Sequence, residues 1–193
     1  MGEEKKRLPV GLENFEQIIK DNYYYVDKTG LISELLRNGG MVNLFTRPRR
    51  FGKTLNMSML EHFFSIEREQ SIFDGFEISK DTKLCEAYMG KYPVISISLK
   101  GINAATYEDA FDSAVQIMQR TAEEFQFLSD SEYLSEHDKS VYRELLDSNM
   151  SETVFCGGLK ILSKLLEKHY RLKVILLIDE YDVPLAKAFE NGY

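Results

Sequence analysis

The sequence predicts an α/β fold with a mainly parallel sheet, and three observations support this prediction. Apolar, strand-like segments alternate with helical ones along the chain. Residues 174–178 (Val-Ile-Leu-Leu-Ile) form an uninterrupted apolar run, typical of a strand that a parallel sheet buries on both faces. The chain has 193 residues, 44% hydrophobic and 28% charged, as in folded domains that bury a core. This composition argues against a disordered, collagen-like or coiled-coil protein.

The first part of the chain should alternate helices with short extended segments. The expected elements are a helix over 13–20, a β-prone cluster at 23–26, a helix over 29–38, a strand over 41–45 and a helix over 54–67. The helix over 29–38 should end at Gly39-Gly40, since glycine accepts the left-handed conformation of a C-terminal cap. The strand over 41–45 leads into a basic loop, 46–51, so the order here is strand, loop, helix.

The second part should contain two strands separated by a long helical stretch. The expected elements are strands over 94–99 and 174–178, helices over 107–127, 138–146 and 158–169 between them, and a final helix over 183–192. Pro93 sets the start of the first of these strands. The chain shows no repeat, low-complexity tract or linker, so we expect one domain over residues 1–193.

The sequence Gly52-Lys53-Thr54, after a predicted strand and before a helix, matches the end of a phosphate-binding loop. In such loops, backbone N–H groups and the helix N-terminus hold phosphate oxygens. Lys53 would reach the β- and γ-phosphates, and the Thr54 hydroxyl would be a Mg²⁺ ligand. Arg47 stands where the usual pattern has glycine, and Pro48 removes a backbone donor. The alternative is an ordinary helix start with Thr54 as a capping residue.

The strand over 174–178 runs into Asp179 and Glu180 at its C-terminal end, where α/β folds bind ligands. Asp179 would hold Mg²⁺, directly or through water, and Glu180 would be the general base toward the attacking water. The alternative is that both acids cap the following helix. The two motifs together predict a nucleotide site with Lys53 and Glu180 as catalytic residues and Thr54 and Asp179 as metal ligands. The predicted nucleotide-binding residues are Arg49, Arg50, Phe51, Gly52, Lys53, Thr54 and Leu55.

Four phrases resemble the N-terminal P-loop region of the bacterial AAA-ATPase-like family, whose large members commonly carry a PD-(D/E)XK nuclease-like region at the C-terminus. They are YYYVDKTGLISELL, NLFTRPRRFGKTLNMSMLEHFF, YPVISISLKG and VILLIDEYDVPL. The resemblance covers residues 8–185, and RPRRFGKT and DEYD are its most specific parts. It implies a P-loop NTPase-like three-layer sandwich, ATP and Mg²⁺ as cofactors, and the same roles for Lys53, Thr54, Asp179 and Glu180. The Arg-Pro-Arg-Arg loop is normal for that family.

An acidic pair at the end of the second motif strand is typical of P-loop ATPases with an additional strand between the two motif strands. The residues after Glu180 instead predict a helix, so we expect a sheet truncated after the Asp-Glu strand and an incomplete domain. The sensor residue, arginine finger and lid would lie beyond Tyr193. The chain should therefore bind nucleotide weakly and hydrolyse it poorly, ATP hydrolysis belonging to the full-length parent. The unpaired strand edges at the gap favour self-association.

The net charge, the cysteines and the apolar runs indicate which kinds of partner and which cellular compartment to expect. A net charge of −7 gives no overall attraction for nucleic acid, so any such contact would be local. Cys85 and Cys156 form no Cys-x-x-Cys pair, which disfavours a disulfide scaffold or a zinc site and indicates a reducing compartment. The longest apolar run, 174–178, is too short to span a bilayer, and the N-terminus lacks the apolar stretch of a signal peptide. We therefore expect a cytoplasmic protein without a membrane partner.

Several other residues have alternative interpretations. Arg47, Arg49 and Arg50 would contact nucleotide phosphates, nucleic acid or acidic side chains. The tyrosines at 23–25 would stack on adenine or pack in the core. The histidines share no metal-ligand spacing and are expected at the surface or at helix ends: His62, His137 and His169.

Three functions fit these observations. The first is an ATP-binding, Mg²⁺-dependent P-loop region whose full-length parent couples hydrolysis to motion of its C-terminal parts. The second is a nucleotide-gated switch that changes partners with little turnover. The third is a scaffold whose altered loop takes no phosphate. The chain has no Asn-Lys-x-Asp motif, which would read guanine, and this favours adenine.

Overall fold

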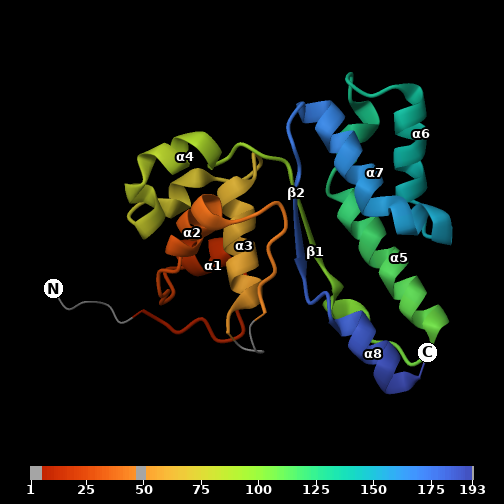
Figure 1. Ribbon diagram of the computed structural model, residues 1–193, viewed down its shortest axis with the longest axis horizontal. Helices are drawn as coiled ribbons and strands as arrows, with labels where there is room; N and C mark the ends of the chain where they lie inside the picture. The colour runs from red at the N-terminus through yellow and green to blue at the C-terminus, as the bar shows by residue number, and fades with distance from the viewer. Residues whose placement is uncertain (1–5, 47–50, 193) are drawn as a thin grey trace. The chain divides into compact units, whose positions relative to one another are not determined.

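The computed structural model describes residues 6–46 and 51–192, and the chain divides into two compact units (Figure 1). Unit 1 comprises residues 1–92 and unit 2 residues 93–193. Helices and a small parallel sheet occur in the same chain, so the predicted α/β class agrees with the observed elements. In the part of the chain that the structure describes, no helix is long and apolar enough to cross a membrane.

Unit 1 is built from short helices around an aromatic core. Its elements are α1 (Phe15–Lys20), α2 (Gly30–Asn38), α3 (Lys53–Phe64), α4 (Thr82–Tyr88) and the 3-10 turns η1 (Gln70–Phe73) and η2 (Glu77–Lys80). Helix α1 packs against α3. Phe15 of α1 is fully buried at the centre of the cluster and stacks on Phe73 with 5.2 Å between ring centroids. The core of unit 1 therefore holds α3 against α1 and η1.

The strand predicted over 41–45 is wrong. These residues form no strand, and no described residue pairs with their backbone. Met41 and Val42 are 102% and 90% exposed, so their apolar side chains take no part in a core. A short apolar run becomes a strand only when a neighbouring strand satisfies its N–H and C=O groups. The β-prone cluster at 23–26 likewise forms no strand.

Unit 2 contains the sheet and the long helices. Its elements are β1 (Val94–Ser98), η3 (Leu99–Gly101), α5 (Tyr107–Glu123), η4 (Gln126–Asp130), α6 (Glu136–Leu145), α7 (Glu152–Tyr170), β2 (Ile175–Asp179) and α8 (Val183–Asn191). Strands β1 and β2 pair in parallel, in a register that runs from Val94 opposite Ile175 to Ser98 opposite Asp179. Both strands were predicted to within a residue. Their parallel pairing requires the long crossover that α5, α6 and α7 provide.

The core of unit 2 lies among α5, α6 and α7 and reaches Ile95 of β1. Helix α6 packs on α7, and α5 contacts both α7 and β1 (Figure 1). The largest fully buried side chain is Tyr142 on α6, whose hydroxyl donates a hydrogen bond to the carbonyl oxygen of Ala122 at 2.8 Å. These contacts fix β1, and through the sheet pairing they fix the C-terminal end of β2 beside it.

Helix α7 begins six residues before the predicted start at Gly158, and two local features explain the difference. The Ser151 side chain accepts a hydrogen bond from the N–H of Val154 and caps the helix. Gly158 then lies against Met118: a Cβ atom at this position would approach the Met118 sulfur to 2.9 Å. Glycine here therefore permits close helix packing, although by itself it disfavours a helix.

Candidate functional site

The Gly-Lys-Thr motif forms the N-terminus of α3. Gly52 is the N-cap residue, with φ of 74° in the left-handed region, and Lys53 is the first helical residue. Gly52 has no side chain, so the first turn of α3 receives no side-chain cap, and it contains no acidic residue. Thr54 lies inside the helix rather than at the cap, which excludes the alternative that it is the N-cap. The N-terminus of α3 thus presents backbone donors and a positive dipole end.

The side chains around this helix start differ in exposure. Phe51 is 58% exposed, whereas Lys53, Thr54 and Leu55 are half-buried. The Lys53 ammonium makes no ion pair or hydrogen bond with any described residue. An unpaired ammonium next to a helix N-terminus is suited to bind an anion.

Four residues of the predicted loop lie outside the described residues. They are Arg47, Pro48, Arg49 and Arg50. Their predicted contacts with phosphate, including the nucleotide-binding roles of Arg49 and Arg50, stay predictions.

Lys28 is a residue of this region that the sequence analysis missed. Its Nζ atom lies 3.7 Å from the position that a Cβ atom on Gly52 would occupy. The side chain is exposed and, like that of Lys53, has no ion pair or hydrogen bond with another described residue. The phrase YYYVDKTG contains Lys28, but nothing in the local sequence brings it to the start of α3.

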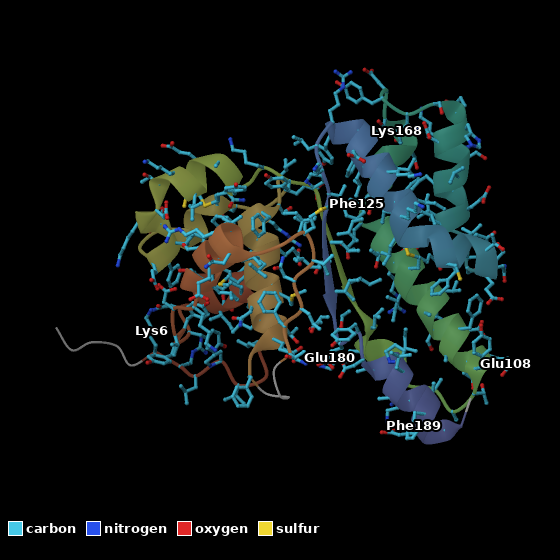
Figure 2. All side chains as sticks on the ribbon, in the orientation of Figure 1. Lys6, Glu108, Phe125, Lys168, Glu180 and Phe189 are labelled. Carbon is cyan, nitrogen blue, oxygen red and sulfur yellow. The ribbon has the colours of Figure 1, made fainter. Side chains whose placement is uncertain are left out.

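The acidic motif lies at the end of β2. Asp179 is the last residue of the strand and is buried, and its Oδ1 accepts a hydrogen bond from the N–H of Glu180 at 3.0 Å. Figure 2 shows Glu180 at the turn between β2 and α8. Helix α8 begins at Val183, so neither acid is its N-cap. Asp182 occupies the N-cap position without a side-chain cap hydrogen bond.

Glu180 has a strained backbone, and this gives a prediction about stability. Its φ of 54° lies in the left-handed region, which costs a residue with a side chain about 1–2 kcal/mol. Glu180→Gly is expected to raise the free energy of unfolding by about 0.5–1 kcal/mol relative to Glu180→Ala, because glycine relieves the strain but gains entropy in the unfolded chain. Urea denaturation of both variants measures the difference. Equal stability would mean that the backbone at Glu180 stores no strain.

The two motifs belong to different units. Lys53 and Thr54 lie in unit 1, and Asp179 and Glu180 lie in unit 2. No group of three or more His, Cys, Asp or Glu within residues 6–46 and 51–192 is arranged to hold a metal ion. Of the predicted metal ligands, Thr54 thus belongs to one unit and Asp179 to the other.

The tyrosines at 23–25 differ in their environments. Tyr25 packs its ring edge-on against Phe15, 5.3 Å between centroids, and its hydroxyl donates to the Met59 sulfur at 3.4 Å. Burial raises the pKa of Tyr25 to about 12. Tyr24 is exposed, and the Tyr23 ring lies beneath the Arg7 guanidinium. Tyr25 is therefore a core residue of unit 1, which agrees with the core alternative for that position.

Two of the three histidines, His62 and His169, have structural roles. His62 lies in the last turn of α3, yet it is buried, with Nδ1 2.8 Å from the carbonyl oxygen of Ser58 and Nε2 3.2 Å from the Glu16 carboxylate. His169 lies in the last turn of α7 and bonds to the Ser131 hydroxyl through Nδ1. Burial of His62 could not be inferred from spacing, because it results from the packing of α1 on α3.

These features define an α/β protein with a Gly-Lys-Thr helix start and an Asp-Glu strand end. A family model described as "Predicted AAA-ATPase" matches residues 9–193, and the chain belongs to this AAA-ATPase-like family. It is 29% identical over 182 residues to "Uncharacterized protein in vnfD 5'region" of Azotobacter chroococcum mcd 1. That similarity covers 94% of this chain but 30% of the relative, so the chain spans less than a third of the relative's length. No solved structure matches the chain.

Proposed function

We propose that this chain is the ATP-binding region of a bacterial AAA-like ATPase and that it binds ATP with Mg²⁺. The observation that carries the proposal is the start of α3, in a chain of the AAA-ATPase-like family: Gly52 is left-handed and gives no side-chain cap, and Lys53 makes no ion pair with another described residue. Backbone donors, a helix dipole and a lysine ammonium together suit a polyphosphate. In this proposal residues 1–193 belong to a P-loop domain of the three-layer type.

The proposed roles follow from the chemistry of each side chain. Lys53 binds the β- and γ-phosphates through charge-assisted hydrogen bonds. The hydroxyl of Thr54 and the carboxylate of Asp179 are hard oxygen donors of the kind that Mg²⁺ prefers. Glu180 is the general base that polarises the attacking water. Mg²⁺, when bound, neutralises charge on the phosphates.

The remaining residues of the proposed site lie along the loop. Arg49, Arg50, Phe51 and Leu55 flank the phosphates in this proposal.

Hydrolysis by the chain is weak, and turnover belongs to a longer protein. A nucleotide-gated switch differs from an ATPase only in turnover, so an ATPase assay on a longer version of the chain separates the two.

The proposal also covers association and location. Strand β2 pairs with β1 and with no other described strand, and we include self-association in the proposal because strands at the edge of a sheet favour it. Cys85 and Cys156 are both free thiols, and we propose that the protein works in the reducing cytoplasm. The charge of −7 gives no support for a nucleic-acid partner.

The test is calorimetric and thermal-shift titration with Mg²⁺-ATP of the chain, of its Lys53→Ala variant and of a version extended through the next two strands. ATP should raise the melting temperature of the wild-type protein, because a ligand of the native state stabilises it. Lys53→Ala should weaken ATP binding by about 100-fold, the value of a lost charge-assisted contact. Lys83→Ala, an exposed lysine of α4, is the matched control and should bind like wild type.

Two outcomes decide the proposal. Binding that disappears with Lys53→Ala, in the chain or in the extended version, supports the site. Absence of binding in both forms contradicts it and leaves the scaffold function.

A further inference from the structure

Lys28 lies at the start of α3 although it is far from Gly52 in sequence. Its Nζ atom is 3.7 Å from where a Cβ atom on Gly52 would be, so the ammonium lies close to the N-cap backbone. Gly52 is adjacent to Lys53, the residue proposed to bind phosphate. Two lysines, Lys28 and Lys53, therefore lie near the N-terminus of α3.

The backbone on both sides of Lys28 is anchored. The Asp27 carboxylate accepts hydrogen bonds from the N–H and the hydroxyl of Thr29, at 2.8 and 2.7 Å, and from the N–H of Glu77 at 2.7 Å. Buried Thr29 accepts in turn from the N–H of Ile78 at 3.1 Å. Burial alone would raise the pKa of Asp27, but these hydrogen bonds outweigh it and the pKa lies below its usual value. The residues on both sides of Lys28 are thus hydrogen-bonded to the backbone of η2.

The two lysines at the helix start are not paired with acidic side chains among the described residues. Neither Lys28 nor Lys53 forms an ion pair with another described residue, and the first turn of α3 contains no acidic side chain. Two like charges beside the positive end of a helix repel each other, and a bound anion removes that repulsion. The hydrogen-bonding capacity of Asp27 is directed to Thr29 and Glu77.

We propose that Lys28 is a second phosphate-contacting residue of this site and binds the triphosphate group together with Lys53. The inference rests on the proposed function and extends it to a residue outside the Gly-Lys-Thr motif. Lys28 approaches from the anchored 27–29 turn, whereas Lys53 belongs to α3, so the two ammonium groups hold the same polyphosphate from different elements. Lys28 and Lys53 recognise the negative charge of the phosphates and not the base of the nucleotide.

The experiment compares Lys28→Met, Lys28→Arg and the matched control Lys83→Met by calorimetry, with ATP and with inorganic tripolyphosphate as ligands. It uses the chain or, if ATP binding needs more residues, the extended version. Lys28→Met should weaken binding of both ligands about tenfold, the order expected for one partly exposed charge contact. Lys28→Arg should retain binding within about threefold, and Lys83→Met should match wild type. Without ligand, the melting temperature of Lys28→Met should not fall, because the lost ammonium has no ion pair or hydrogen bond with another residue that the structure describes.

The outcomes separate this inference from the proposed function. Wild-type binding that Lys53→Ala abolishes and Lys28→Met leaves unchanged overturns the role of Lys28 and keeps the site. A lower melting temperature of unliganded Lys28→Met, with no rescue by arginine, assigns Lys28 a purely structural role and also overturns the inference. Absence of any ATP or tripolyphosphate binding overturns both proposals.

Discussion

Replacing Phe15 by alanine is expected to lower the free energy of unfolding of unit 1 by about 3–5 kcal/mol, the usual cost of deleting a fully buried aromatic ring. The ring stacks on Phe73 and meets Tyr25 edge-on, and its removal leaves a cavity that short helices cannot close without moving. The N–H of Phe15 also donates to the Ser58 hydroxyl at 3.0 Å, which ties α1 to α3.

The consequence reaches the candidate site because Phe15 supports the helix that carries Lys53. With α1 loosened, α3 loses its main packing partner in unit 1. We therefore expect the Phe15→Ala variant to lose ATP-dependent stabilisation together with fold stability, although Phe15 is not one of the site residues.

Urea denaturation and hydrogen exchange of peptides from α1 and α3 measure the effect. The control is Phe189→Ala, the same substitution on α8 at a side chain that is 90% exposed (Figure 2), and it should change stability by less than about 0.5 kcal/mol. If both variants unfold at the same urea concentration, the aromatic cluster is not the core of unit 1.

The elements of unit 2 were predictable because their signals are local. The apolar run at 174–178 predicts a parallel strand, and β2 occupies Ile175–Asp179. Pro93 and the following apolar residues predict β1, which begins at Val94. On β1 the burial agrees with the side chains that the sequence supplies. On β2 the expectation of a strand buried on both faces is wrong, because Leu176 and Ile178 are 41% and 38% exposed. They alternate with buried Leu177 and Asp179, the pattern of a strand with one buried face.

The errors in unit 1 arise from partners that the sequence does not reveal. Residues 41–45 have the composition of a strand, but a strand also needs a neighbour, and local propensity contains no information about one. The same limit applies to Lys28, since its position near Gly52 depends on how Asp27 and Thr29 attach to η2. The Gly-Lys-Thr helix start was predictable because the motif and the helix are contiguous.

Tyr142→Ala is expected to lower the free energy of unfolding by about 3–5 kcal/mol, and Tyr142→Phe by about 1 kcal/mol. Tyr142 is fully buried in the core of unit 2, so alanine leaves a large cavity. Phenylalanine removes only the hydrogen bond to the Ala122 carbonyl oxygen. That oxygen also accepts from the N–H of Phe125 at 3.0 Å, so it stays hydrogen-bonded in the variant and the cost is at the low end.

The ionisation of Tyr142 provides a second, independent measurement. Burial, reinforced by the charge of Glu123, raises the pKa of Tyr142 to about 12. Because the pKa in the folded state exceeds that of an ordinary tyrosine, this residue contributes stability below about pH 10 that is lost as the pH rises toward 12. Tyr142→Phe should therefore lose less stability than wild type between pH 10 and 12. Tyr133→Phe, which alters an exposed ring, should follow wild type.

If Tyr142→Phe cost as much stability as Tyr142→Ala at pH 7, the hydroxyl and not the ring would be the main contributor. That result would contradict the packing of α5, α6 and α7 around the Tyr142 ring.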